Sequence, residues 1–431
     1  MGREMKKSGI EWIGDIPETW NVYRHKHVMH KEKNLCEHYN GEDIISLTMN
    51  GVVIRNLDAG GKMPATFDGY QYVDPEDLLL CLFDIDVTPR CVGLVKNYGI
   101  TSPAYSRFKV HQGYHSAYYD YLLRTIDDKK VLVHLAKNLR STFTESDFGA
   151  LPTVVPPLEE QKKIALFLDS ECSRIDSVIE KTQASIEEYK KLKQAIITEA
   201  VTKGIRPKRK MKESGIEWVK EIPSEWTLSK VKVDYSFGKG LPITKDNLVE
   251  DGVPVISYGQ IHAKANTGVG INKDLIRYVS DYYMDNNPGS LVRAGDFIFA
   301  DTSEDVDGCG NCVYIDIEDN LFAGYHTIIL KSRKAVNNKY YAYLFKSDSW
   351  RKQIRTKVSG VKVFSVSKKM LSNASLLVPS YDEQKEIVRY LDNKCDSIDR
   401  IVSAKENLIT ELESYRKSLI FEYVTGKKEV V

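Results

Sequence analysis

Few residues in this sequence have the types and spacing that catalysis or metal binding requires. No GxxxxGK[ST] phosphate loop is present, no GxGxxG opens a helix, and no nucleophile is paired with a base at a recognisable spacing. Three small clusters lack the matching ligands of a metal site and fit packing or solvated roles better: the pair Cys309 and Cys312, the histidines His25, His27 and His30, and the pair Asp84 and Asp86. The sequence therefore predicts no catalytic residue and no metal site.

Binding to phosphate groups is the chemistry that the residues support best. Residues 331–369 contain twelve Lys or Arg and a single acidic residue, Asp348, which gives a local excess of +11. Aromatic residues, among them Tyr341, Tyr343 and Trp350, are interleaved with the cations. Solvated helix faces usually mix the two signs, so this segment predicts contact with DNA. The candidates are Lys331, Arg333, Lys334, Tyr340, Arg351, Lys352, Arg355, Lys357 and Lys362.

Polar residues that could contact bases follow the first expected strand of each variable region. Asn and Gln suit bidentate contact to adenine, while Ser, Thr and Tyr can bond bases or phosphate. Two lysines that flank a Gly-rich turn could hold phosphate. Surface solvation is the alternative for each residue taken singly. The candidates are Thr48 and Asn50 in the first half, beside Ser46, and Lys239, Lys245, Ser257, Tyr258 and Gln260 in the second.

An internal repeat organises the elements that must position these residues. The segment SGIEWIGDIPETW at 8–20 matches SGIEWVKEIPSEW at 214–226 in eight of thirteen positions, at an offset of 206. Residues 156–179 match residues 379–402 in ten of twenty-four positions, at an offset of 223. A repeat of this length indicates two homologous domains, each followed by a connector, and excludes a solenoid. The apolar runs 77–83 and 295–301, and later 101–110 and 321–331, predict corresponding strands.

The connectors are predicted to be long helices that pair as a coiled coil. Apolar residues recur every seven positions from residue 158 to residue 203, and again after residue 381, with charged residues between them. A single helix with an exposed apolar stripe would be unstable, so antiparallel pairing of the two helices is expected; the alternative is that each helix seals its own domain. The seam residues are Leu168, Cys172, Ile175, Ile179 and Ile186 in the first helix, and Leu391, Cys395, Ile398, Val402 and Ile409 in the second.

Composition excludes several classes of protein. The 431 residues carry 61 Lys and Arg against 60 Asp and Glu, a net charge of +1 that argues against a uniformly basic DNA-coating protein. No apolar run approaches the roughly 20 residues that span a bilayer, and no secretory segment opens the chain. Seven scattered cysteines do not form a disulfide framework. We therefore expect a cytoplasmic protein that does not bind membranes.

These features together resemble the specificity subunit of type I restriction–modification systems. The resemblance rests on MKxSGIEWxxxIPxxW at 5–20 and 211–226, PLEEQKKI at 157–164, DEQKEI at 382–387, GKGLPITKDNL at 238–248 and GVPVISYGQIH at 252–262. It implies that each variable region is a target recognition domain reading half of a bipartite DNA sequence, with the helices setting the spacing. It also implies that the helices dock two methyltransferase subunits, and that restriction subunits join the complex. S-adenosylmethionine, ATP and Mg would then belong to the partners, with no cofactor in this chain.

The expected fold is α+β, with two mixed α/β target recognition domains joined by two long helices in an antiparallel coiled coil and a pseudo-two-fold internal repeat. The expected segments are a first recognition domain at 1–150, a central helix at 151–205, a second recognition domain at 206–373 and a C-terminal helix at 374–431. A non-catalytic DNA-reading subunit in host defence is the function that this arrangement favours. A coiled-coil scaffold with protein-binding ends, and an enzyme that methylates alone, are the alternatives.

Overall fold

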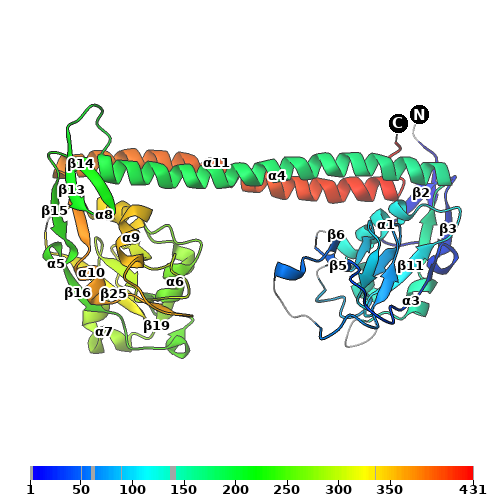
Figure 1. Cartoon of the computed structure of the whole chain (residues 1–431), viewed down its shortest axis with the longest axis horizontal. Helices are drawn as coiled ribbons and strands as arrows, with labels where there is room; N and C mark the ends of the chain where they lie inside the picture. The colour runs from blue at the N-terminus through cyan, green and yellow to red at the C-terminus, as the bar shows by residue number, and fades with distance from the viewer. Residues whose placement is uncertain are drawn as a thin grey trace. The chain divides into compact units, whose positions relative to one another are not determined.

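The computed structural model describes residues 3–49, 51–59, 64–88, 90–135, 142–334 and 336–430. The chain forms two compact units, Met1–Gln183 with Glu406–Val431, and Ala184–Lys405. The two long helices are α4 (Leu158–Lys203) and α11 (Tyr381–Val424) (Figure 1). Each of them is divided between the units, with one half in the first unit and the other half in the second. Every unit therefore contains one recognition domain, the first half of the helix that follows it, and the second half of the other long helix.

The helix halves pack antiparallel in each unit. In the first unit the ring of Phe167 packs against that of Tyr423 at an angle of 40°, and Asp176 pairs with Arg416. In the second unit Lys193 pairs with Asp399 at 2.6 Å and Arg206 with Glu386 at 3.0 Å. The predicted seam residues point inward, since eight of the ten are buried and the other two, Val402 and Ile409, are half-buried. The predicted coiled coil is thus confirmed within each unit.

Glycines end both helices at equivalent positions. Gly204 and Gly426 each have a φ of +73°, a left-handed conformation that glycine adopts without strain at a helix C-terminus. A side chain at Gly426 would meet Pro17 and Trp20, so the backbone here lies directly against the repeated N-terminal segment of its own unit.

The first recognition domain contains two four-stranded sheets, with strand orders β6-β5-β10-β7 and β4-β11-β8-β9, and the pairs β1-β2 and β12-β3. Parallel pairing occurs between β10 and β5, and the other pairs in these sheets are antiparallel. The strands are β1 (Met5–Lys7), β2 (Asp15–Pro17), β3 (Asn21–Arg24), β4 (Met29–Lys31), β5 (Ile44–Thr48), β6 (Gly51–Ile54), β7 (Gln71–Val73), β8 (Leu78–Leu80), β9 (Val92–Leu94), β10 (Gly99–Thr101), β11 (Ser106–Val110) and β12 (Pro152–Val155). The helices are α1 (Ser116–Asp128), α2 (Val131–Leu135) and α3 (Glu145–Ala150).

The second recognition domain repeats this plan with a five-stranded sheet, β17-β19-β18-β24-β20, a four-stranded sheet, β16-β25-β21-β23, and three two-stranded pairs. The strands are β13 (Met211–Ile216), β14 (Val219–Pro223), β15 (Thr227–Lys230), β16 (Tyr235–Lys239), β17 (Leu248–Val249), β18 (Val253–Ile256), β19 (Arg277–Val279), β20 (Leu291–Val292), β21 (Phe297–Ala300), β22 (Thr302–Ser303), β23 (Cys312–Tyr314), β24 (Leu321–Ala323), β25 (Thr327–Ser332), β26 (Phe364–Ser365) and β27 (Ser375–Val378). The helices are α5 (Val231–Asp234), α6 (Tyr258–His262), α7 (Tyr282–Asn286), α8 (Asn338–Lys346), α9 (Asp348–Arg355) and α10 (Lys368–Ser372).

Strand pairing places the end of each recognition domain a few residues later than the sequence predicts. Strand β12 pairs with β3, and β27 pairs with β15, so the last strand of each domain lies beyond the expected limits of 150 and 373. The expected strand segments 101–110 and 321–331 each include parts of two strands, β10 with β11 and β24 with β25. The fold class itself is confirmed: mixed α/β domains on paired long helices. No helix among the described residues is both long and apolar enough to cross a bilayer.

Candidate nucleic-acid interface

A repeated three-residue contact ties each recognition domain to its helix. In the first unit the indole Nε1 of Trp20 donates to Glu160 at 2.9 Å, and the same carboxylate pairs with Arg3. In the second unit Trp226 donates to Glu383 at 3.0 Å, and Arg209 pairs with that carboxylate at 2.5 Å. Each Arg also lies over the indole ring, 5.6 Å from its centroid. Both repeats therefore fix the start of the helix in the same way.

A second repeated contact comes from tyrosines that lie outside the two repeated segments of each half. The hydroxyl of Tyr118 donates to the carbonyl of Val424 at 2.8 Å, and the hydroxyl of Tyr340 lies 3.3 Å from the carbonyl of Val201. The signal was available in the sequence, because SAYYDYLL at 116–123 resembles NKYYAYLF at 338–345. Both segments form helices that pack on the long helix pair, so they are structural elements of the repeat.

The aromatic residues of the basic segment are consequently in the core. Tyr340, predicted as a DNA contact, has no exposed surface and also lies 3.3 Å from the carbonyl of Leu377, so that prediction is wrong. Tyr341, Tyr343 and Trp350 are buried in the same hydrophobic cluster. Their spacing reflects the buried faces of α8 and α9, which a linear count of aromatics cannot distinguish from a stacking surface.

Several predicted cations are engaged within the domain. The Lys331 ammonium donates to the carbonyl of Leu291 at 2.8 Å, and Lys334 pairs with Asp234 at 2.5 Å. Arg351 is 9% exposed and donates to the carbonyl of Asp307 at 2.7 Å, so its predicted role as a surface DNA contact is also wrong.

Arg355 is also engaged, since it pairs with Asp348 at 2.5 Å and donates to the carbonyl of Asp307 at 2.7 Å. Arg333, by contrast, is exposed. The excess of +11 is therefore not one continuous charged surface.

The cations that remain available lie toward the end of the segment. Five lysines are exposed and form no ion pair or side-chain hydrogen bond with the described part of the chain: Lys352, Lys357, Lys362, Lys368 and Lys369. Residues 349–381 contain no Asp or Glu, so no carboxylate neighbours them in sequence. Unpaired ammonium groups, here close together in the sequence, are what a phosphate-contacting surface requires. We call these five residues the lysine cluster.

The predicted base-contacting residues lie on strands and a short helix. Thr48 ends strand β5 with its hydroxyl donating to the carbonyl of Gly51 at 2.9 Å, and Ser46 lies within that strand. Asn50 falls outside the described residues. Lys239 ends strand β16 and Lys245 begins a 3₁₀ turn, both exposed.

Ser257 caps α6 and is 2% exposed, so its predicted contact with DNA is wrong. Gln260 accepts a hydrogen bond from the Ser257 amide at 3.0 Å, which commits its Oε1 to this cap. Tyr258 is half-buried and lines an open cavity with Arg355, and its ring lies beside those of Tyr325 and His326. Of the three predicted residues, Tyr258 therefore offers the better-placed side chain for a contact.

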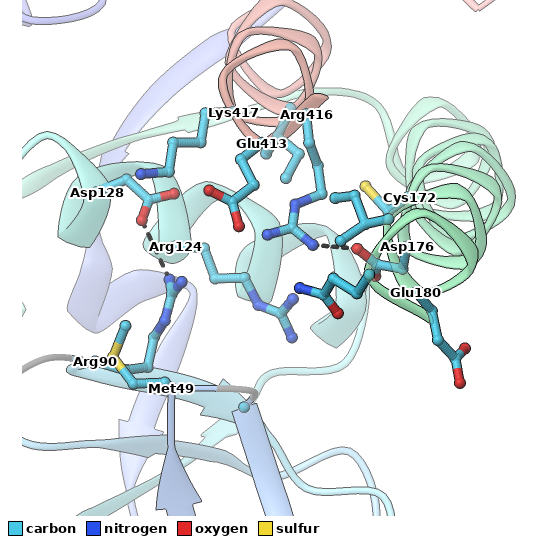
Figure 2. A pocket seen from close by; sticks show the side chains of 14 residues that line it. Met49, Arg90, Arg124, Asp128, Cys172, Asp176, Glu180, Glu413, Arg416 and Lys417 are labelled. Atoms are coloured by element: carbon cyan, nitrogen blue, oxygen red, sulfur yellow. Dashed lines mark hydrogen bonds and ion pairs between the residues drawn. The ribbon is translucent and has the colours of Figure 1, made fainter. Parts of the chain in front are cut away.

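Equivalent cavities occur where the helix pair meets each recognition domain. The cavity of the first unit has a volume of about 420 Å³, and Figure 2 shows Arg416 paired with Asp176 on one side and Arg90 paired with Asp128 on the other. The cavity of the second unit has a volume of about 440 Å³. Equivalent positions of the repeat line both: Cys172 and Cys395, Asp176 and Asp399, and Lys193 and Arg416 at an offset of 223, and Arg124 and Lys346 at the offset of 222 that relates α1 to α8. In both cavities an ion pair joins the two long helices, Asp176–Arg416 or Lys193–Asp399, and in the second cavity Lys339 of α8 also pairs with Asp392 of α11 at 2.9 Å.

Burial shifts the pKa of two side chains outside these cavities. Burial lowers the pKa of the His25 imidazole to about 4 and raises the pKa of the Cys312 thiol to about 12. Both shifts favour the neutral, unreactive form at neutral pH. Within the described residues no three His, Cys, Asp or Glu side chains are grouped so as to hold a metal ion.

Comparison with known proteins identifies relatives of the whole arrangement. A family model described as the type I restriction modification DNA specificity domain matches residues 223–413. The MjaVIII specificity subunit of Methanocaldococcus jannaschii is 26% identical over 287 residues, which cover 66% of this chain and 63% of that subunit. The putative MjaX specificity subunit of the same organism is 24% identical over 455 residues, covering 97% of this chain and 96% of that protein.

A solved structure shows the same fold. A chain from a structural study of the assembly and conformational transition of a type I restriction–modification system is 15% identical, with a TM-score of 0.71. The similarity covers 96% of this chain and 99% of the other. The repeated helix contacts therefore accompany a likeness to known proteins: residues 223–413 match the type I restriction modification DNA specificity domain, and nearly the whole chain is similar to the putative MjaX specificity subunit.

Proposed function

We propose that this chain is the non-catalytic, sequence-reading subunit of a type I restriction–modification complex, in which each recognition domain reads one half of a bipartite DNA target. The observation that carries the proposal is the repeated scaffold. The Trp–Glu–Arg contact and the tyrosine contact to the end of a long helix recur in both units, while the domains that these contacts hold differ in sequence and in the size of their sheets. Two different readers on one repeated frame suit a target with two different halves.

The lysine cluster supports contact with the DNA backbone. Phosphate contacts fix the position of a reader on the duplex, whereas a few side chains at base edges supply the sequence preference. The five unpaired lysines can make such phosphate contacts and so fix the position of the second domain on the duplex. Lys239 and Lys245, exposed on the same domain, remain candidates of the same kind.

Exposed apolar residues on the helices support docking of two equal partners. The first unit exposes Val178 and Tyr415, and the second exposes Ile401 and Leu192 at the equivalent positions. Each pair flanks an interhelical ion pair, Asp176–Arg416 or Asp399–Lys193. We assign these two surfaces to two methyltransferase subunits, since identical partners require equivalent sites.

The chemistry of the complex is assigned to the partners. The methyltransferase subunits would bind S-adenosylmethionine, and restriction subunits would bind ATP and Mg. We place the complex in the cytoplasm, because all seven cysteines are free and buried, as is usual in a reducing compartment.

Binding of the purified full chain to duplex DNA tests the proposal. We expect specific binding whose affinity falls steeply with salt, and no methylation until methyltransferase subunits are added. The double variant Lys357→Gln/Lys362→Gln should weaken binding to every duplex and reduce the slope of log K against log salt by about 2, because each phosphate contact contributes about 0.9.

The matched control is Lys162→Gln/Lys190→Gln, which removes two exposed lysines paired with Glu159 and Glu187 on α4. This control should bind DNA like the parent chain. Absence of DNA binding by the chain and by its complex would instead favour a protein-binding scaffold. Methylation by the isolated chain would show an enzyme.

A further inference from the structure

The loop Ser359–Val363 in the second recognition domain exposes apolar side chains that packing does not explain. Val361 is 95% exposed, the highest fraction among the large apolar side chains that the structure describes, and Val363 is 51% exposed. Contact with water carries a free-energy cost for such side chains. Because two exposed valines lie at one tip beside the exposed Lys357 and Lys362, the tip is an apolar surface bordered by charge, the pattern that marks an interaction site.

The loop is held firmly at both ends. Val358 and Phe364 pack against the main hydrophobic cluster of the second domain. Phe364 and Ser365 form β26, which pairs with Ser303 and Thr302 of β22. A side chain on Gly360 would approach the carbonyl oxygen of Val363 to 2.1 Å, so the turn is tight. Because both anchors are fixed, the valines between them project from the domain rather than folding back onto it.

The positive charges beside the valines favour duplex DNA over a protein as the partner. Lys357 and Lys362 flank the tip and belong to the lysine cluster, whose members form no ion pair with the described residues. A protein partner would need a matching acidic and apolar surface, whereas duplex DNA offers phosphates on either side of base edges that include the apolar methyl group of thymine. The exposed residues Lys357, Val361, Lys362 and Val363, in this order along the chain, fit a duplex groove.

The short side chain of valine favours contact with the edge of a base over insertion between stacked bases. Side chains that wedge between stacked bases are longer or flatter, such as Phe, Leu, Ile, Met and Pro. Valine ends at its γ-carbons and suits contact with a group that protrudes from the base. In the major groove that group is the C5-methyl of thymine.

We propose that Val361 determines part of the sequence specificity by contacting the C5-methyl group of a thymine in the half-site that the second recognition domain reads. This inference rests on the proposed function, and it identifies Val361 as one of the residues that read the DNA sequence. Lys357 and Lys362 hold the flanking phosphates, and the neighbouring β22–β26 pair keeps the loop in place.

The test uses the full chain with its methyltransferase subunits. Methylated sites are first mapped in cells, and the mapped duplex is then synthesised with deoxyuridine replacing each thymine of the relevant half-site in turn. Deoxyuridine lacks only the methyl group, so the parent chain should bind one of these duplexes about fourfold more weakly. The variant Val361→Ala should bind the thymine and deoxyuridine duplexes equally.

In cells, Val361→Ser should relax the methylated sequence at one position of one half-site and leave the other half-site unchanged. The control is Val233→Ser, which replaces a valine that is 50% exposed on α5 of the same domain and should change nothing. An unchanged methylation pattern and unchanged affinity for Val361→Ser and Val361→Ala would overturn the inference, as would a half-site without thymine. Absence of specific binding by the parent chain would instead contradict the proposed function.

Discussion

The hydroxyl of Tyr340 lies near two carbonyl oxygens in a site that water does not reach. Replacing Tyr340 with Phe should lower the free energy of unfolding by about 1–2 kcal/mol, because two buried acceptors lose a partner. Urea denaturation measures the free energy of unfolding, and titration with duplex DNA measures the affinity for DNA. DNA affinity should not change below the unfolding transition.

Tyr118→Phe should have the same effect in the first unit, where the hydroxyl donates to Val424. Tyr282→Phe is the control, because Tyr282 is 64% exposed. A loss of DNA affinity without loss of stability in Tyr340→Phe would restore Tyr340 as a DNA contact.

His25 makes the stability of the first unit depend on pH. The imidazole is buried against Phe148, and neither ring nitrogen has a hydrogen-bond partner among the described residues. Burial lowers its folded-state pKa to about 4, while the unfolded chain has the ordinary value of about 6.5.

Between these values the unfolded state binds more protons, so stability is complete above pH 6.5 and falls as the pH drops toward 4. The loss amounts to about 3 kcal/mol, since each pH unit between the two pKa values is worth about 1.4 kcal/mol. Thermal melts from pH 7.5 to pH 4.5 should show a smaller decline for His25→Leu than for the parent. His27→Gln, in which an exposed neighbour is replaced, should melt like the parent. An equal decline in all three proteins would contradict this assignment.

At the scale of elements, α4 and α11 should act as a ruler for the spacing of the half-sites. A seven-residue insertion preserves the heptad pattern and lengthens a helix by about 10 Å, equivalent to about three base pairs. Placed after Gln183 and after the equivalent Glu406, it should lengthen the spacer by about three base pairs and leave both half-sites unchanged. Methylated-site mapping in cells provides the measurement.

The matched control inserts the same seven residues in α4 alone. One helix then exceeds its partner by two turns, so the control should be less stable and should not give a single longer spacer. Altered half-sites at constant spacing in the double insertion would exclude the ruler.

At the scale of the whole molecule, the repeat predicts that two partners bind independently at equivalent surfaces. Val178→Glu/Tyr415→Glu places charges on the first surface only and should leave a complex with one methyltransferase subunit. Adding Leu192→Glu and Ile401→Glu should abolish binding of both. Light scattering of the purified complexes gives the mass of each.

Leu408→Glu is the control, because Leu408 is 42% exposed on α11 but its repeat equivalent is Ser185. It should retain both partners. Loss of both subunits from the first variant would show a single shared site.

The sequence by itself determined the doubled plan and the long helices. Local spacing carries this information, since a heptad such as Leu168, Cys172 and Ile175 defines a buried face wherever the helix lies. The matching segments at 8–20 and 214–226 showed in the same way that two domains share one scaffold.

Only the tertiary structure decided which residues of the basic segment can contact DNA. Exposure depends on what α8 and α9 pack against, and those partners come from distant parts of the chain, so Tyr340 and Arg351 are buried while Lys357 and Lys362 are exposed. The boundaries of the units were likewise beyond the sequence, because each long helix contributes to two hydrophobic cores. The spacing of apolar residues shows that one face of a helix is buried. Only the fold shows which segments of the chain that face packs against.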